Sequence, residues 1–210
     1  MSLAKTLWEE NVDLARRTLE HRFVRGLGDG SLPLGSFREY VAQDAFFLEA
    51  FGRAYALALA HSPDRVGLHD FAGLLAGALE ELGLHGKYAE RWGVDLGDVV
   101  PGEAALAYTD FLLATASLRG VGETCAAMTP CMRLYAFLGQ SLAAEGFDKD
   151  NAYAEWIQTY SAPDFEALAG TLENLLDRYA EDGPAVRTAY RRAMNLELAF
   201  FEANAEETDG

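Results

Sequence analysis

Cys131 is the residue of this chain best suited to nucleophilic chemistry. It follows Pro130 directly in the apolar run TPCMRLYAFLG, and Tyr135 lies four residues further on. Residues four apart share one face of a helix, so the thiol and the phenol are expected to point the same way. Proline lacks a backbone N–H and clashes with the preceding turn, so a helix either begins or kinks at residue 130. If the helix begins there, free N–H groups and the helix dipole stabilise a thiolate at Cys131.

Core packing is the alternative for this residue, because free cysteine is among the most buried residue types. The other cysteine, Cys125, has no neighbouring proline and is interpreted as structural. The two thiols are six residues apart, nearly two turns of a helix, which is too far for a disulfide. Reduced thiols are typical of a cytoplasmic protein, so we expect that location.

Two carboxylates fall on helix faces that are otherwise apolar. Asp44, in YVAQDAFFLEAF, lies beside Tyr40 and Phe47 on a helical wheel, and Glu197, in AMNLELAFFEAN, has apolar or aromatic residues at positions 193, 194, 200 and 201. A solvated flank of the helix is the structural alternative for each. A buried carboxylate needs a partner or a function, so we predict that Asp44 and Glu197 reach one cavity from different helices.

Tyrosines and histidines give weaker signals. Tyr108, Tyr135 and Tyr160 occur in apolar, helical surroundings, where a tyrosine is usually part of the core with its hydroxyl satisfied locally. The four histidines form no HxxxH or HExxH pair, and Glu81 with His85 is interpreted as a hydrogen-bonded pair on a helix surface. The sequence therefore predicts no metal site.

Composition excludes several classes of partner. The chain has 210 residues, 33 acidic against 17 basic, and a formal net charge of −16. That charge repels phosphate backbones and anionic lipid surfaces, so nucleic acid and membrane are not expected partners. No apolar stretch reaches membrane-spanning length, and the first residues do not form a secretion signal.

Apolar residues recur at spacings of three and four, and strand formers are few, so an all-α fold is predicted. We expect one compact multi-helix domain over residues 1–210, with a frayed tail from about residue 206. Ser36 and Glu39 form a capping-box pattern at the second helix, and the glycine-rich stretch 25–35 is not expected to hold a helix. About eight helices are expected, over residues 3–21, 36–59, 63–92, 103–118, 123–142, 148–161, 163–179 and 184–205.

Four segments together resemble the TenA family, also called thiaminase II or aminopyrimidine aminohydrolase. They are HRFVRGLGDGSLPLGSFREYVAQDAFFLEAF, TPCMRLYAFLG, YAEWIQTYSAPDF and LELAFF, and they occur in family order across nearly the whole chain. The resemblance implies the all-helical fold of haem oxygenases, a homotetramer, and a small closed pocket for an aminopyrimidine or thiamin. It implies no metal or organic cofactor.

The resemblance also implies a role for each matching residue. Cys131 would be the nucleophile that adds to the pyrimidine ring, and Glu197 would protonate a ring nitrogen. Asp44 would contact the pyrimidine, and Tyr135 would lie near the thiol. Hydrolysis of aminomethylpyrimidine, or of thiamin, would then give hydroxymethylpyrimidine, as in thiamin salvage. The cysteine separates this chain from the family branch that relies on a glutamate instead.

The remaining matches are aromatic. Tyr108 and Tyr160 would contact the ring of the substrate. Phe47 stands where the family often has tyrosine, and Phe201 stands where it often has tryptophan, so stacking is kept and a hydroxyl donor near the catalytic group is lost. These two departures concern substrate preference and rate more than family membership.

Two other functions stay open at this point. One is a haem or tetrapyrrole protein of the same fold, with His21 as an axial ligand, although Cys131 would then have no role. The other is a non-catalytic regulatory protein that binds a pyrimidine. Among substrates, aminomethylpyrimidine, thiamin and formylated precursors are not separated by the sequence, because the pocket walls decide between them.

Overall fold

The computed structural model describes residues 2–205, except for the side chains of residues 84, 85, 87 and 88. The expected frayed tail from residue 206 lies outside these residues. The described part of the chain is helical and contains no strand. It forms ten helices: α1 (Leu3–Glu10), α2 (Val12–Glu20), α3 (Arg22–Asp29), α4 (Leu34–Ala60), α5 (Arg65–Trp92), α6 (Glu103–Leu118), α7 (Val121–Glu145), α8 (Ala154–Ser161), α9 (Pro163–Tyr179) and α10 (Pro184–Asn204).

The first expected helix, 3–21, is wrong as a single element, because the chain breaks at two polar residues. Asn11 leaves helical geometry with φ −116° and ψ 10°, and its side-chain amide donates to the Leu7 carbonyl at 2.7 Å. His21 is extended, and its Nδ1 accepts the Phe23 N–H at 3.4 Å. Side chains that bond nearby backbone groups compete with the helix, so three short helices replace one long helix.

The glycine-rich stretch does hold a helix, contrary to expectation. α3 includes Gly26 and Gly28, and it ends at Gly30, whose φ of +80° is the left-handed conformation that glycine adopts without strain. The Asn151 side chain donates to the carbonyls of Leu27 at 2.8 Å and of Gly28 at 3.2 Å. These contacts with a distant part of the chain outweigh the low helix propensity of glycine.

The capping box at Ser36 is also wrong. α4 begins two residues earlier, with Pro33 at the N-cap position, and Ser36 is buried inside the helix. Glu39 instead accepts a hydrogen bond from the Gln43 side chain at 2.8 Å. Among the later helices, α6 spans the expected 103–118, and Pro163 and Pro184 open α9 and α10 as first-turn residues. Two expected starts are wrong: α8 begins at Ala154 rather than at 148, and α5 begins after the Asp64 cap rather than at Pro63.

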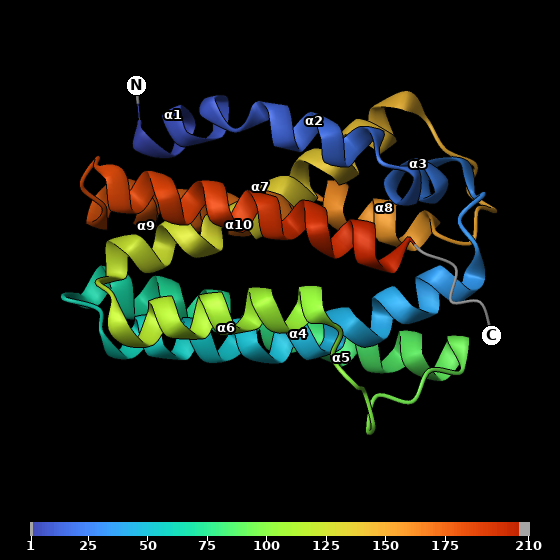
Figure 1. The fold of residues 1–210 in the computed structure, drawn as a ribbon, viewed down its shortest axis with the longest axis horizontal. Helices are drawn as coiled ribbons and strands as arrows, with labels where there is room; N and C mark the ends of the chain where they lie inside the picture. Colours follow the sequence, from blue (N-terminus) through green and yellow to red (C-terminus); the bar gives the residue numbers. More distant parts are fainter. Residues whose placement is uncertain (1, 206–210) are drawn as a thin grey trace.

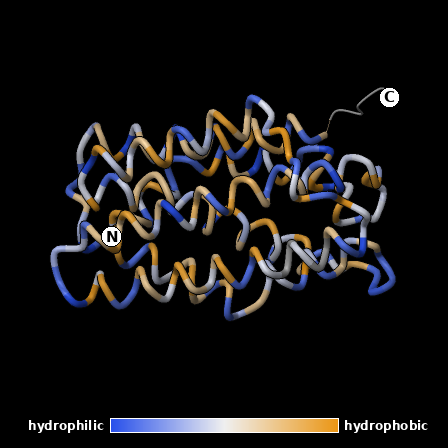
Figure 2. Tube along the Cα trace, turned by 90° about the horizontal axis from the view of Figure 1, so that it is seen from below, coloured by the Kyte–Doolittle hydropathy of each residue, from blue (hydrophilic) through white to orange (hydrophobic). Residues whose placement is uncertain are grey.

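The helices pack in two layers (Figure 1). α4 lies against α5 and α6 in one layer, and α7 lies against α8, α9 and α10 in the other, with α1 to α3 covering the outer side of the second layer. Apolar and polar residues alternate along the helices (Figure 2), so each helix can turn an apolar stripe inward. The core therefore lies between the helices of both layers, where the candidate residues also converge.

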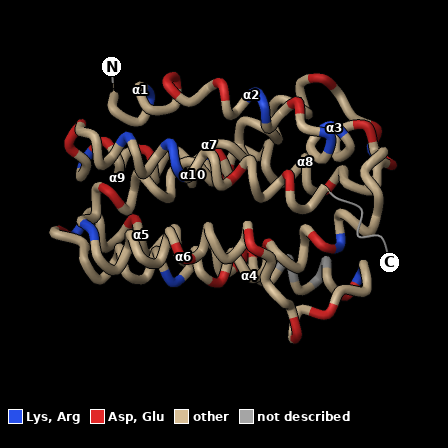
Figure 3. The backbone as a smooth tube through the Cα atoms, viewed as in Figure 1, with Lys and Arg blue, Asp and Glu red and all other residues tan. Residues whose placement is uncertain are grey.

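Charged residues lie along both layers without any long basic segment (Figure 3). The most enclosed arginine is Arg133 on α7, whose Nε donates to Glu173 Oε1 at 2.7 Å and whose Nη1 donates to Glu166 at 2.9 Å. Both carboxylates belong to α9, so this cluster sets how α7 lies on α9. No helix in the described part of the chain is long and apolar enough to cross a membrane.

Gly139 sets the approach of α7 to α8. A Cβ at this position would lie 2.5 Å from the Tyr160 carbonyl carbon and 2.7 Å from the Tyr160 Cβ. Backbone at that distance cannot rotate away as a flexible side chain can. Only glycine therefore allows the two helices to come this close, and the contact holds Tyr160 against the Cys131 face of α7.

Gly139→Ala is expected to destabilise the fold by about 3 kcal/mol, the upper end of the cost of overpacking, because the two helix backbones must separate. Gly73→Ala is the matched control, since nothing lies within 4 Å of the Cβ position on that exposed part of α5. It should be neutral or stabilising by about 0.5 to 1 kcal/mol. Urea unfolding of both variants measures the difference, and equal stability would show that α7 and α8 can separate at little cost.

Candidate active site

A small cavity lies where five helices meet. It offers about 20 Å³ to the centre of a water-sized sphere, which is about the room that one ordered water needs. Most of its lining is aromatic or aliphatic, with a thiol and two carboxylates among the described residues. The lining residues are Asp44, Phe47, Leu48 and Phe51 of α4, Glu81 of α5, Cys131, Met132 and Tyr135 of α7, Tyr160 of α8 and Phe165 of α9.

A larger hollow lies at the surface, between the C-terminal end of α6 and the N-terminal end of α10. Its volume is about 690 Å³, and its polar lining includes Asp110, Arg119 and Glu123. No cysteine lies among its described lining residues, and Asp110 and Arg119 are exposed. The small cavity is therefore the candidate active site, because nucleophilic and acid–base groups meet there out of water.

Cys131 lies in the middle of α7 rather than at a helix start, so that part of the expectation is wrong. α7 runs through Pro130, which costs the Ala126 carbonyl its usual N–H partner but does not begin a new helix. The Cys131 side chain is 9% exposed. Burial raises the pKa of this thiol well above its ordinary value, and the nearby Glu197, Asp44 and Glu81 raise it further. The resting group is a thiol rather than a thiolate.

Cys125 is buried on the same helix but away from the cavity. Both cysteines are free, in agreement with the expected reduced state. Burial raises the pKa of Cys125 to about 12, and it is not among the described lining residues. This environment matches the structural interpretation of Cys125.

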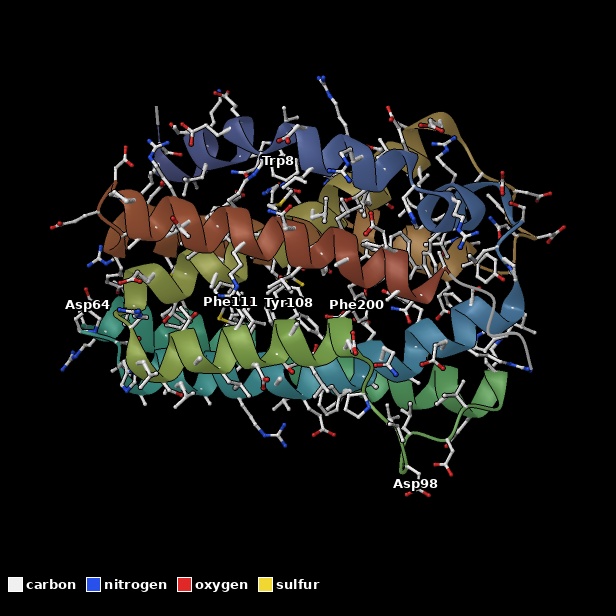
Figure 4. The ribbon with its side chains drawn as sticks, in the orientation of Figure 1. Trp8, Asp64, Asp98, Tyr108, Phe111 and Phe200 are labelled. Atoms are coloured by element: carbon white, nitrogen blue, oxygen red, sulfur yellow. The ribbon has the colours of Figure 1, made fainter. Side chains whose placement is uncertain are left out.

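Glu197 of α10 lies beside the thiol. Its side chain is 2% exposed, and it is close enough to the Cys131 thiol for each group to shift the pKa of the other. Unlike Asp44, it is not among the described residues of the cavity lining, although the two were expected to reach one cavity. The Tyr108 hydroxyl of α6 donates to Glu197 Oε1 at 2.6 Å. Figure 4 shows Tyr108 between α6 and α10, where the two layers face each other. Burial raises the pKa of Glu197 to about 8, while the bond from Tyr108 and the neighbouring thiol act to lower it.

Asp44 reaches the cavity from the opposite layer. It is 4% exposed on α4, one turn before Phe47 and Leu48, which also line the cavity. The Asp44 charge raises the pKa of both Cys131 and Glu197, so the carboxylate lies within electrostatic range of each. The Phe47 ring, which lines the cavity, packs on Tyr108 with ring centroids 4.7 Å apart, so Tyr108 supports this wall from behind.

The remaining expected tyrosines form a hydrogen-bonded aromatic cluster with two residues that the sequence did not single out. Tyr135 and Tyr160 meet edge to face with centroids 4.8 Å apart. The Tyr40 hydroxyl donates to the Tyr135 hydroxyl at 3.2 Å, and Trp156 Nε1 donates to Tyr40 at the same distance. Tyr40 and Trp156 therefore hold Tyr135 in place.

Glu81 was missed as a site residue. It lines the cavity, and its Oε1 accepts the Tyr160 hydroxyl at 2.7 Å. Phe71, Leu74 and Ala78 are the buried residues before it on α5, and the spacing of three and four continues to position 81. That periodicity was the available signal. The expected partner of Glu81, the side chain of His85, lies outside the described residues.

The described histidine side chains do not contribute to the candidate active site. His61 and His69 are exposed, and His21 caps α3 through its bond to the Phe23 N–H. None of these three is among the described residues of the cavity lining. Within the described residues, no group of three His, Cys, Asp or Glu side chains could hold a metal ion.

The amino-acid sequence of this chain is similar to those of known proteins. The family model TENA/THI-4/PQQC matches residues 8–207. The chain is 36% identical over 207 residues to the "Bifunctional TH2 protein, mitochondrial" of Arabidopsis thaliana, covering 86% of this chain but only 34% of that protein. It is 33% identical to an aminopyrimidine aminohydrolase of Halalkalibacterium halodurans, covering 96% of this chain and 95% of that protein.

A solved structure agrees with the fold. A TenA family transcription regulator from Silicibacter sp. matches with a TM-score of 0.89 at 28% sequence identity, over 97% of this chain and 96% of that one. The chain spans about a third of the plant relative, so it corresponds to one part of that larger protein.

Glu197→Gln is expected to lower the pKa of the Cys131 thiol, because it removes a nearby negative charge that raises this pKa. Titration of thiolate absorbance measures the change. A Cys125→Ser background leaves one thiol to titrate, and Glu202→Gln is the control, since Glu202 is exposed on the same helix. An unchanged titration in Glu197→Gln would mean that the carboxylate and the thiol do not interact.

Proposed function

The chain belongs to the TENA/THI-4/PQQC family, and on that premise we propose that it is a hydrolase of thiamin salvage. It converts aminomethylpyrimidine to hydroxymethylpyrimidine, with thiamin as the second candidate substrate. The observation that carries the proposal is the buried Cys131–Glu197 pair beside a cavity with aromatic walls. The name of the Halalkalibacterium relative, which the chain covers almost completely, supports the substrate class.

Substrate binding uses the aromatic walls and Asp44. The cavity as it stands admits about one water, so its side chains must move apart to admit the substrate. A flat pyrimidine ring then stacks on Phe47 and is flanked by Tyr108 and Tyr160, as the resemblance to the family implies. Asp44 accepts N–H hydrogen bonds from the amino-substituted ring. The phenol of Tyr135 packs against Tyr160 and lies on the same face of α7 as Cys131. Tyr135 and Cys131 therefore line the same side of the cavity.

The first covalent step is addition of Cys131 to the ring. The sulfur forms a bond to a carbon of the electron-poor ring, and the thiol proton passes to the Glu197 carboxylate. Glu197 then gives this proton to a ring nitrogen, which accepts the electron pair displaced by the sulfur. Glu197 thus acts first as base and then as acid, and its pKa of about 8 suits both roles at neutral pH.

The adduct then expels the amine. Electrons from the ring nitrogen break the bond between the exocyclic carbon and the ammonium nitrogen, and ammonia leaves with both bonding electrons. Water forms a new bond to the exocyclic carbon and loses a proton. Finally the carbon–sulfur bond breaks, and the ring-nitrogen proton returns through Glu197 to the thiol. The sum is aminomethylpyrimidine and water to hydroxymethylpyrimidine and ammonium.

The two alternative functions leave the Cys131 thiol without a role. A haem or tetrapyrrole protein with His21 as ligand leaves the Cys131–Glu197 pair without a role, and His21 is engaged in capping α3. A regulatory protein that only binds a pyrimidine also makes no use of the thiol. The homotetramer implied by the resemblance stays a prediction.

Cys131→Ser is expected to lower turnover by two orders of magnitude or more, because a serine hydroxyl is far less ionisable than a thiol. Hydroxymethylpyrimidine should still bind, since the aromatic walls and Asp44 are unchanged. Cys125→Ser is the matched control, because this thiol is also buried on α7 but does not line the cavity among the described residues. Ammonia release from aminomethylpyrimidine, with thiamin hydrolysis beside it, measures turnover and substrate preference. A Cys131→Ser variant that keeps most of its activity would remove the nucleophile from the mechanism.

Tyr108→Phe should move the acidic limb of the pH–rate profile upward. The active pair holds one proton, so the rate rises as Glu197 loses its own proton near pH 8. The Tyr108 hydroxyl stabilises the Glu197 carboxylate, so its loss raises the pKa and lowers the rate at pH 7 about tenfold. Tyr190→Phe is the control, because the buried Tyr190 hydroxyl has no hydrogen-bond partner among the described residues. Identical profiles for Tyr108→Phe and wild type would contradict the proton relay.

A further inference from the structure

Glu81 is one of the two carboxylates in the cavity lining, and the proposed mechanism leaves it unused. It comes from α5, whereas Asp44 comes from α4 and Glu197 from α10. Its Oε1 is held by the Tyr160 hydroxyl at 2.7 Å, and Tyr160 is itself fixed by the close approach of Gly139. The carboxylate is therefore a positioned group in the cavity wall rather than a mobile surface side chain.

The carboxylates occupy different places around the thiol. Glu197 accepts a hydrogen bond from Tyr108, and neither of these two residues is among the described residues of the cavity lining. Glu81 accepts the Tyr160 hydroxyl, and both of these residues line the cavity. Its charge still raises the pKa of both Cys131 and Tyr40, so it lies within electrostatic range of the reacting sulfur.

We propose that Glu81 determines substrate specificity by binding the ammonium group of the substituent that leaves the pyrimidine. This inference rests on the proposed function of the same cavity. Asp44 engages the ring and Glu197 engages the thiol and the ring nitrogen, which leaves the exocyclic aminomethyl group for the third carboxylate. Aminomethylpyrimidine carries a positive charge on that group at neutral pH, whereas the hydroxymethyl product carries none.

The charge difference gives Glu81 a selective effect. A carboxylate forms a charge-assisted hydrogen bond with an ammonium group, and such a bond is about twice as strong as one between neutral partners. The product offers only a neutral hydroxyl at the same position. Glu81 therefore favours the substrate over the product and assists product release. The Tyr160 hydroxyl keeps the carboxylate in one orientation, so little side-chain entropy is lost on binding.

Calorimetry with two ligands tests this role without any turnover. Binding of aminomethylpyrimidine and of hydroxymethylpyrimidine is measured at pH 7 in a Cys131→Ser background, with and without Glu81→Gln. The glutamine keeps the shape and an acceptor for Tyr160 but removes the charge. We expect the affinity for the aminomethyl ligand to fall about tenfold or more and that for the hydroxymethyl ligand to fall less than about threefold.

Two further variants separate charge from structure. Glu80→Gln is the matched control, because Glu80 is the exposed neighbour on the same helix. It should leave both affinities unchanged. Glu81→Asp keeps the charge on a shorter side chain, so it should retain most of the preference for the aminomethyl ligand. Equal losses for both ligands in Glu81→Gln, or no loss for either, would overturn the proposal.

Failure of this inference can be told apart from failure of the proposed function. If wild-type protein hydrolyses aminomethylpyrimidine but Glu81→Gln keeps the affinity ratio of the two ligands, only the role of Glu81 is overturned. If wild-type protein binds both ligands with the Glu81-dependent ratio and hydrolyses neither, the catalytic proposal falls and the binding role stands. If neither ligand binds, both are overturned.

Discussion

Removal of a thiol and a carboxylate from water is the constraint on which the site depends. A buried ionised group loses its hydration, so burial favours the uncharged forms of both Cys131 and Glu197. The hydrogen bond from Tyr108 partly replaces the lost water for the carboxylate, and the neighbouring thiol also lowers the pKa of Glu197. The pair can therefore hold and move one proton within the protein interior. An exposed pair would instead exchange its proton with solvent, and its acid and base would titrate at ordinary values.

Several contacts far apart in the sequence keep this pair in position. Arg133 bonds two carboxylates of α9 and so fixes α7 from the side away from the cavity. Gly139 lets α8 approach α7 closely enough for Tyr160 to reach the cavity wall. Trp156 and Tyr40 then orient Tyr135 by successive hydrogen bonds. The reacting groups belong to long helices, so their geometry depends on packing between helices rather than on a mobile loop.

Periodicity was sufficient to predict that helices occur where α5 to α10 lie, and proline positions predicted the starts of α9 and α10, because both signals act locally. The start of α8 was placed six residues too early. Local rules failed where a distant segment decided the outcome: α3 forms despite its glycines because Asn151 bonds its carbonyls. Pro130 was expected to allow a helix start, yet packing on both sides of α7 carries the helix through it. Resemblance to a family brought Asp44, Cys131 and Glu197 together as candidates, but the bond between Glu81 and Tyr160 joins positions 79 residues apart and needed the structure.

The raised pKa of the Cys131 thiol bears on how long the protein survives in the presence of peroxides. Oxidants attack thiolates far faster than thiols, and exposed sulfur faster than buried sulfur. At rest Cys131 is protonated and 9% exposed, within a cavity that admits about one water. Its nucleophilic form arises only when a bound ring supplies somewhere for the proton to go. The same burial that makes the resting sulfur a poor nucleophile thus protects it from sulfenic and sulfinic acid formation between turnovers.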